Sequence, residues 1–425
     1  MFKLKIHSFK VFMSEKFPRF WLKVRQLKWR IILPIRRIKA LIRAKKSDLH
    51  ADPHKVYWIP TDMIKKSIYR QLEGVPNTAL AYGTIKGGNW DLDTLPIEKE
   101  TIFISAKNRF VDGVKWQKTK HYTDTLDRIF YGEMVFGCKN KEDLEIYFKK
   151  FDQLYETIKK HGYKTQRELL EGDGKNYVDD EISVHIDRVG HYIFSNGAHR
   201  LSIALILGLK IIPVMVCIRH AEWQSFVNEI LAYAKINDGH VYQPFIHPDL
   251  KDIPSAHGGK RFEIIKKHLS HNKGTLLDIG SHWGYFCHLF EDLGFDCYAV
   301  ESAHEHLYFL KKLKIAGYKN FKIIEQSILD FDEINFFNVV LALNIFHHFL
   351  KTEEMYHKLI SFLNRTNMNM MFFEPHIFEE TQMENAYRNY KPDEFVQFIL
   401  ANSCLKHSEI IGKAEDGRVM YKLWQ

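Results

Sequence analysis

The chain has 425 residues, 45% hydrophobic and 14% aromatic, with 12 prolines and a formal net charge of +9 at pH 7. This composition predicts folded domains with apolar cores and excludes low-complexity disorder and collagen-like repeats. Residues 1–50 hold 15 Lys+Arg against two acidic residues, a local +13, so the other 375 residues carry 46 − 50 = −4. The five cysteines form no Cys-x-x-Cys pair, which predicts a reducing, cytoplasmic location and no structural zinc site.

Residues 1–50 are expected to form a basic amphipathic arm. Between residues 17 and 44, apolar residues recur every three or four positions with basic residues between them, as in an amphipathic helix. Such a helix can lie in the interface of an anionic membrane, so residues 17–46 are a predicted peripheral contact with its inner face. Two alternatives stay open: the apolar stripe packs on the protein's own body, or the arm binds nucleic acid. Nucleic acid is disfavoured because the rest of the chain offers no basic track.

The segment 190–204 is predicted to run from a strand through a tight turn into a helix. The turn ends in His199 and Arg200, which therefore lie where unpaired backbone amides and the helix dipole attract an anion. A guanidinium at this place can engage two phosphate oxygens at once. The predicted ligands of a nucleotide phosphate are Asn196, Gly197, His199 and Arg200.

This turn, its helix and the following strand 211–218 resemble the ParB/sulfiredoxin-like superfamily, whose members bind CTP, ATP or ADP and include free-serine kinases. The resemblance implies an α+β nucleotide-binding domain over residues 51–236, with ATP, ADP or CTP and Mg²⁺ as ligands. Sulfiredoxin chemistry is disfavoured, because Ala198 and His199 stand where a reactive cysteine is needed. A kinase also needs a carboxylate near the transferred phosphate.

Asp179, Asp180 and Glu181 are the candidates for that carboxylate, and Glu181 is the predicted catalytic acid. The alternative is a solvated turn between a helix and a strand. The stretch between the opening strand of this domain and the phosphate turn is an insertion with a helix over residues 141–161. In it, Trp90 and Asp91 are expected to form a turn stabilised by a buried indole.

Three prolines between residues 244 and 254 predict a linker over residues 237–256, followed by a helix from 259 to 269 that lies over a ligand. A strand then leads into a glycine turn and a further helix. Asp278 ends the strand, Gly280 and Gly284 shape the turn, and a second strand ends in Glu301. A carboxylate at that second position can accept hydrogen bonds from both hydroxyls of a ribose. Three more buried strands, 321–325, 338–343 and 370–373, complete the pattern of a doubly wound α/β sheet.

The residues Asp278, Gly280, Gly284 and Glu301 match the Asp-x-Gly-x-x-x-Gly loop and acidic strand end of class I S-adenosylmethionine-dependent methyltransferases, which residues 255–425 resemble. The resemblance implies a Rossmann-like methyltransferase domain over residues 257–425 with S-adenosyl-L-methionine as its cofactor. It also places Asn344 beside the methyl group and Ser327 near the adenine. A GxGxxG dinucleotide site is disfavoured, because three residues separate the glycines and no third glycine follows.

His347 and His348 follow the fourth strand, and either is a candidate general base for the methyl acceptor. The alternatives are that they are ordinary partly exposed histidines, or that an acceptor of low pKa needs no base. Glu374-Pro375-His376 together with 390–395 is similar to methyltransferases that methylate a terminal phosphate oxygen. A strand end followed by a capped helix is the alternative there.

These observations predict a two-domain α/β enzyme: a methyltransferase fused to a nucleotide-binding domain. Kinase activity of the nucleotide-binding domain is one of the hypotheses. Such a pair can form a methyl or methyl-phosphate cap on a glycan, glycolipid or small-molecule acceptor. A second hypothesis makes the first domain a non-catalytic, nucleotide-gated recruiting module. A third, nucleic-acid methylation, ranks last because the Asn/Asp-Pro-Pro-Tyr motif of amino-group DNA methylators is missing.

Overall fold

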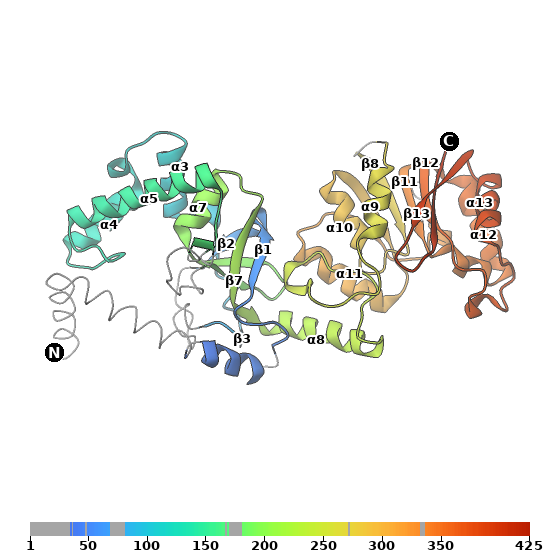
Figure 1. Ribbon diagram of the computed structural model, residues 1–425, viewed down its shortest axis with the longest axis horizontal. Coiled ribbons are helices and arrows are strands. Elements are labelled where there is room, and N and C mark those ends of the chain that lie inside the picture. The colour runs from blue at the N-terminus through green and yellow to red at the C-terminus, as the bar shows by residue number, and fades with distance from the viewer. Residues whose placement is uncertain are drawn as a thin grey trace. The chain divides into compact units, whose positions relative to one another are not determined.

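The computed structural model of the chain describes residues 35, 37–46, 49–68, 81–165, 168–169, 181–270, 273–331 and 336–425 (Figure 1). The chain divides into two compact units, Met1–Asn228 and Glu229–Gln425, and the division falls within helix α8 (Ala221–Ile236). Each unit has its own sheet with helices packed on it. The predicted fold class, two α/β domains, is confirmed.

The sheet of the first unit mixes parallel and antiparallel strands. Its order is β1 (Val56–Pro60), β7 (Ile211–His220), β5 (Ile182–Ile186), β6 (Tyr192–Asn196), β2 (Ile64–Ser67) and β4 (Leu95–Pro96), with β3 (Thr84–Lys86) also paired to β7. Strand β7 is buried at every position after the first, as expected for a nearly continuous apolar run at the centre of a sheet. It pairs in parallel with β5, which pairs antiparallel with β6.

The predicted insertion forms a helical layer with its own apolar cluster. It contains α3 (Thr101–Phe110), α4 (Lys120–Phe130) and α5 (Lys141–His161). Helix α5 has the predicted bounds: Asn140 caps its N-terminus by accepting a hydrogen bond from the Asp143 amide at 2.8 Å, and Gly162 with φ 74° ends it. Trp116, Phe148 and Phe151 form the centre of the cluster, which also includes Ile203 of helix α7 (Ala198–Ile206).

Only the end of the predicted arm lies in the described part of the chain, where residues 37–46 are helical; residues 17–34 lie outside it. This helix packs on the first unit through the buried Ala40 and Ala44, and Arg43 donates a 2.8 Å hydrogen bond to the Tyr82 carbonyl. Ile38 and Ile42 are 56% and 60% exposed. At its described end the arm therefore packs on the body, as the alternative has it, but through alanines and not through the isoleucines of the stripe.

The sheet of the second unit is parallel over five strands. Its order is β10 (Lys322–Ile324), β9 (Phe295–Val300), β8 (Gly274–Ile279), β11 (Phe336–Leu343), β12 (Asn367–Glu374), β14 (Val419–Trp424) and β13 (His407–Lys413). The chain runs outward from β8 to β10, then crosses to β11 on the other side of β8. Ligands of open α/β sheets bind beyond the carboxyl ends of the strands at such a reversal. The antiparallel pair β13 and β14 was not predicted.

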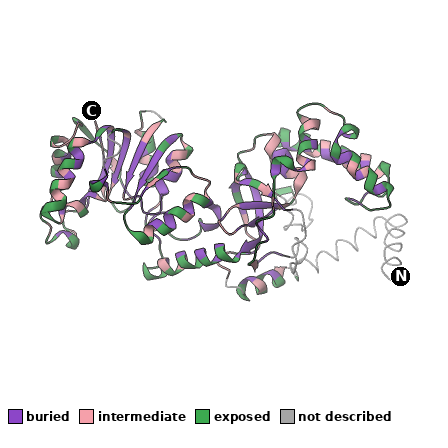
Figure 2. Cartoon of the chain, turned by 180° about the vertical axis from the view of Figure 1, so that it is seen from behind, coloured by how far each residue is buried: buried purple, intermediate pink, exposed green. Residues whose placement is uncertain are grey.

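Helices cover both faces of this sheet. Helices α12 (Glu353–Arg365) and α13 (Pro392–Ala401) share one apolar cluster with Leu277, whereas α9 (Lys260–Lys267), α10 (Tyr285–Asp292) and α11 (His304–Ala316) share the opposite one with Leu276. Neighbouring residues of a strand point to opposite faces, so β8 contributes to both clusters. Figure 2 shows the result: the strands are buried, and the helices alternate buried and exposed stripes.

The residues predicted as a linker, 237–256, are packed within the second unit. Val241 and Leu250 are at most 1% exposed, and Val241 forms an isolated β-bridge with Ser255. The prolines that suggested a linker are separated by apolar residues, and these residues bury the segment. No helix in the described ranges has the length and apolar character needed to cross a lipid bilayer.

Candidate functional site

The glycine turn of the second unit lies at the reversal of strand order, between β8 and α10. Gly280 has φ 70° and Gly284 has φ 83°, a region that favours glycine. The Ser281 amide donates a 2.9 Å hydrogen bond to the Val300 carbonyl, which ties the turn to the neighbouring strand. A Cβ on Gly280 would lie 2.7 Å from Ile345 Cδ1. The predicted strand, turn and helix are confirmed, and the close neighbour of Gly280 is a side chain of this chain.

Asp278 lies at the carboxyl end of β8 and is 3% exposed. The Cys287 thiol donates to its Oδ2 at 3.8 Å. Burial raises the pKa of Asp278 to about 7, although that thiol and the charge of Arg261 act to lower it. A carboxylate in this state gains free energy when a cation binds beside it, because the cation offsets its lost hydration.

Glu301 follows β9 and holds the turn in place. Its Oε2 accepts a 2.9 Å hydrogen bond from the His282 amide, and its Oε1 accepts from the amides of Ser302 and Ala303 at 2.8 and 2.9 Å. Burial acts to raise its pKa, but His306 and these amides together lower it, so Glu301 remains ionised. Oε2 accepts one amide hydrogen bond and also lies 3.6 Å from His306 Nδ1.

A buried ion pair lies beside Asp278. Arg261 on α9 and Glu374 at the end of β12 are each 1% exposed, and Arg261 Nη1 lies 3.6 Å from Glu374 Oε1. Burial raises the pKa of Glu374 to about 7 against the charge of Arg261. The guanidinium also lies over the rings of Tyr242 and Phe286, 5.7 and 5.8 Å from their centroids. The predicted helix over the ligand thus carries a cation into this edge of the sheet.

Asn344 stands one residue after β11 with φ 53°, an uncommon value for a residue other than glycine. Its amide donates a 2.8 Å hydrogen bond to the Glu374 carbonyl, which joins the ends of the two strands. Buried polar atoms that lack a hydrogen-bond partner occur in both units of the described structure, and eight of them lie at these strand ends and on the segments next to them: Arg261 Nε and Nη1, Ser281 Oγ, Asn344 Oδ1, Glu374 Oε1 and Oε2, His347 Nδ1 and His376 Nδ1. Buried polar groups are normally paired, so such a set indicates a polar ligand.

The two predicted histidines differ in burial. His347 is buried, and burial lowers its pKa to about 3, so its imidazole is neutral; His348 is exposed, and burial of part of its ring also lowers its pKa. Their ring centroids lie 4.0 Å apart, and the ring of His376 lies 5.6 Å from that of His347. Of the alternative that one or both are ordinary partly exposed histidines, the exposure of His348 fits and the burial of His347 does not.

Two further predictions concern local structure. The Ser327 hydroxyl accepts a 3.2 Å hydrogen bond from the Leu329 amide and so caps a short 3-10 helix; its place near an adenine stays a prediction. Beyond β12, Pro392 begins α13, and the Lys391 amide donates to Glu394 Oε2 at 2.9 Å. The alternative of a strand end followed by a capped helix is confirmed for this segment.

The phosphate turn of the first unit has the predicted form. Asn196 ends β6, Gly197 has φ 94°, and α7 begins at Ala198. The His199 ring lies 2.5 Å from the Tyr147 hydroxyl, and burial lowers its pKa to about 4. Helix α5 of the insertion, which carries Tyr147, thus contacts the turn.

Arg200 and Glu181 lie beside each other at this turn. Arg200 Nη1 lies 4.0 Å from Glu181 Oε2, and the Glu181 side chain is 2% exposed. Glu181 is therefore not part of a solvated turn. Asp179 and Asp180 lie outside the described residues.

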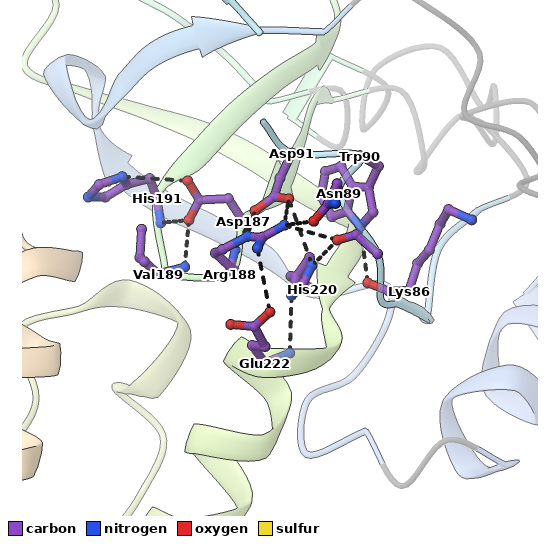
Figure 3. Close-up of polar contacts among 11 residues, drawn as sticks. Lys86, Asn89, Trp90, Asp91, Asp187, Arg188, Val189, His191, His220 and Glu222 are labelled. Carbon is purple, nitrogen blue, oxygen red and sulfur yellow. Dashed lines mark hydrogen bonds and ion pairs between the residues drawn. The ribbon is translucent and has the colours of Figure 1, made fainter. Parts of the chain in front are cut away.

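A rigid polar network fixes the turn that contains Trp90 and Asp91 (Figure 3). Arg188 donates to Asp91 through Nε at 2.8 Å and Nη2 at 2.7 Å, and its Nη1 lies 3.7 Å from Glu222. The Trp90 indole donates to the Lys86 carbonyl at 3.0 Å and is 6% exposed, so the predicted turn with a buried indole is confirmed. The hydrogen bonds of Arg188 give this network a structural role.

Within the described residues, no group of three or more His, Cys, Asp or Glu side chains is arranged to hold a metal ion. All five cysteines lie in that part of the chain as thiols, and four of them are buried.

No protein-family model and no curated protein sequence matches the chain. Among solved structures, the chain is similar to monomeric WbdD, at 17% identity and a TM-score of 0.36, over 46% of this chain and 48% of WbdD. Another WbdD structure, at 17% identity and a TM-score of 0.37, is described as that of a bifunctional kinase-methyltransferase. The N-methyltransferase NodS from Bradyrhizobium japonicum WM9 aligns over 39% of this chain and 94% of NodS, at 12% identity and a TM-score of 0.32.

The alignment spans about half the length of WbdD. These structural neighbours include methyltransferases, as the sequence predicted, and one of them also has a kinase in its description. The resemblance of the first unit to the ParB/sulfiredoxin-like superfamily stays a prediction.

Arg261 was not among the predicted site residues, and Glu374 and His376 were noted only for their similarity to phosphate methyltransferases. A signal for Arg261 existed: it stands four residues before Ile265, on the helix face that the buried Phe262 and Ile265 occupy. A charged residue on a buried helix face points to a partner at the same place.

Proposed function

We propose that the second unit binds S-adenosyl-L-methionine at the carboxyl ends of β8, β9 and β11 and transfers its methyl group to a glycan acceptor. The observation that carries this proposal is the set of buried polar atoms without hydrogen-bond partners, which lies at and around these strand ends within the described structure. The set offers a cation and several hydrogen-bond acceptors, as the zwitterionic end of an amino acid requires.

The residues fit each part of such a ligand. Arg261 offers Nε–H and Nη1–H to a carboxylate, and Asp278 with Asn344 Oδ1 offers acceptors to an ammonium group. The Glu301 carboxylate, at the end of β9, is the acceptor offered to a ribose hydroxyl. When bound, the ligand supplies an electrophilic methyl group on a sulfonium centre. The chain's task is to align the acceptor with that methyl group and to exclude water.

For the first unit we propose nucleotide binding at the turn between β6 and α7. The amides at the start of α7 and the Arg200 guanidinium form an anion site of the kind that holds a phosphate. Glu181 lies next to Arg200, where a carboxylate can orient a hydroxyl for phosphotransfer. Asn196, Gly197 and His199 belong to the same proposal, with ATP, ADP or CTP and Mg²⁺ as ligands. A nucleotide-gated module that recruits the acceptor without phosphotransfer is the alternative.

The acceptor in this proposal is a glycan or glycolipid, and the arm brings the enzyme to the membrane that carries it. The exposed isoleucines of helix 37–46, with Lys39, Lys45 and Lys46 on the same helix, support a contact with an anionic lipid surface. WbdD, whose description joins a kinase and a methyltransferase, supplies a precedent for the two activities in one chain.

The test uses methyl-labelled S-adenosylmethionine, the full chain and a cell-envelope glycolipid extract, with and without each nucleotide plus Mg²⁺. We expect label in the glycolipid fraction and none with Asp278→Asn. Incorporation that requires a hydrolysable nucleotide and fails with Arg200→Ala supports phosphotransfer before methylation. Arg128→Ala, which removes an exposed guanidinium paired with Glu133, is the matched control. Label that enters no glycan fraction would contradict the proposed acceptor.

A further inference from the structure

Resting on the proposed methyltransferase function, we propose that His376 is the catalytic base of the second unit and that the methyl acceptor is a neutral hydroxyl group. The sequence predicts His347 or His348 for this role, with a phosphate acceptor that needs no base as an alternative. The hydrogen bonds around His376 distinguish these cases.

The tautomer of His376 follows from two contacts. Asn389 Nδ2 lies 3.0 Å from the Phe378 carbonyl, which can only accept, so this atom of the amide is the donor. The other amide atom, Asn389 Oδ1, is therefore the acceptor, and it lies 2.8 Å from His376 Nε2. His376 Nε2 must then carry the proton. In a neutral imidazole this leaves Nδ1 with a lone pair.

That lone pair lies inside the candidate site. His376 is 1% exposed, and Nδ1 has no hydrogen-bond partner within the described structure. His376 follows β12 by two residues, next to Glu374, and its ring lies 5.6 Å from that of His347. His347 in turn lies 4.0 Å from the exposed His348, so the three imidazoles run from the surface to the buried Nδ1.

The surrounding groups favour a ligand that donates protons. Both oxygens of Glu374 and His376 Nδ1 are buried acceptors without hydrogen-bond partners in the described part of the chain, although Glu374 Oε1 lies 3.6 Å from Arg261 Nη1. A phosphate dianion is itself an acceptor and would leave them unpaired. Its charge also lacks a partner here, because the free donors of Arg261 are assigned to the carboxylate of the cofactor, and Arg418 is bound to Glu380 at 2.7 Å and to Asp416. A sugar hydroxyl supplies the donor these atoms need.

The methyl transfer forms one bond, breaks one bond and moves one proton. The hydroxyl oxygen forms a bond to the methyl carbon, and the carbon–sulfur bond of the sulfonium breaks, with its electron pair going to sulfur. The hydroxyl proton goes to His376 Nδ1. Asn389 Oδ1 stabilises the resulting imidazolium through its hydrogen bond from Nε2–H, and the proton later passes to solvent. Asn389 is a positioning residue in this scheme.

The first test reads the tautomer in the full chain labelled with ¹⁵N-histidine, with S-adenosylhomocysteine present. The His376 signals are assigned by their loss in His376→Gln. We expect a protonated Nε2 and an unprotonated Nδ1. Asn389→Leu, which removes the acceptor oxygen, should not keep this state. A protonated Nδ1 in the wild type would overturn the proposal whatever the activity.

The second test reads the product of ¹³C-methyl-labelled S-adenosylmethionine and the cell-envelope glycolipid extract. We expect a methyl ether without coupling to phosphorus, and a rate lower by about 10²-fold or more in His376→Gln, with S-adenosylhomocysteine affinity unchanged. The exposed His357→Gln is the matched control. A methyl group coupled to ³¹P, or full activity of His376→Gln, would overturn the proposal. Failure of the wild type to bind S-adenosylhomocysteine would instead contradict the proposed function itself.

Discussion

Arg261 Nη1 lies 3.6 Å from Glu374 Oε1, and both side chains are almost completely buried with hydrogen-bonding atoms to spare. Removing two charges from water costs more than their attraction returns unless further hydrogen bonds complete the pair. The second unit therefore folds with buried charged groups at the carboxyl edge of its sheet that still lack hydrogen-bond partners. A ligand that carries both a carboxylate and an ammonium group can pair its carboxylate with the buried guanidinium and its ammonium group with a buried carboxylate.

The pH dependence of ligand affinity tests this interpretation. The pKa of Asp278 and that of Glu374 are raised to about 7 by burial, so both are largely protonated at pH 5.5. An ammonium group binds the ionised carboxylate, so the ligand must displace protons below pH 7. We expect the affinity for S-adenosylhomocysteine to rise between pH 5.5 and pH 7, by up to about tenfold per pH unit for each proton released. Above pH 7 the affinity should become constant. Calorimetry should show a shallower slope for Asp278→Asn; an equal slope would contradict the assignment.

Gly280 is expected to tolerate no side chain. A Cβ there would meet Ile345 Cδ1 at 2.7 Å and would also have to adopt φ 70°. We expect Gly280→Ala to lower the free energy of unfolding by about 1–3 kcal/mol. Gly417, with φ 87° and open space around its Cβ position, gives the matched control in the same unit. Alanine there has the cost of a positive φ but no steric clash. Thermal unfolding measures both. A loss for Gly280→Ala no larger than that for Gly417→Ala would contradict the close contact.

Arg200→Ala tests the phosphate site of the first unit apart from the methyltransferase. The substitution removes the cation beside the start of α7, and a charge-assisted hydrogen bond contributes about 1.5–3 kcal/mol. We expect the stabilisation of the protein by ATP, ADP or CTP with Mg²⁺ to be largely lost in thermal unfolding, while S-adenosylhomocysteine affinity is unchanged. Equal stabilisation of mutant and wild type would remove Arg200 from the site.

The exposed isoleucines of the arm give a membrane test that leaves the fold intact. Ile38 and Ile42 are more than half exposed, so replacing both with Asp should cost little stability. We expect the double variant to sediment less with vesicles that contain anionic lipid. Tyr131, 83% exposed on the helical insertion, provides a control through Tyr131→Asp. Undiminished sedimentation of the isoleucine variant would exclude this helix as the contact.

Much of the fold was predictable because its signals are local. The apolar strand before Asp278, the glycines after it and the helix over residues 141–161 each specify their own structure. The pair β13 and β14 was missed because β13 is an edge strand with an exposed burial pattern, so its sequence lacks the apolar alternation that marks a strand. The segment 237–256 was misjudged since its prolines are visible in the sequence but its packing partners are not.

The positions of the candidate site residues were predictable where these residues belong to a sequence motif. Asp278, Glu301 and Asn344 stand at the ends of three neighbouring strands, and the order of the sheet brings those ends together. The partnership of Arg261 with Glu374 joins residues 113 positions apart (374 − 261). The tautomer of His376 depends on Asn389 and Phe378, and the spacing of these residues in the sequence does not predict that they are in contact. Such relationships come from tertiary packing.

The central claim is that the carboxyl edge of the second sheet binds S-adenosylmethionine, and titration of S-adenosylhomocysteine into the full chain tests it most directly. We expect saturable binding to the wild type, weaker by about 1–3 kcal/mol in Asp278→Ala and in Glu301→Ala through lost charge-assisted hydrogen bonds. Asp296→Ala, an exposed carboxylate on β9, should bind as the wild type does. No binding to the folded wild type, or equal affinity in all three variants, would contradict the claim.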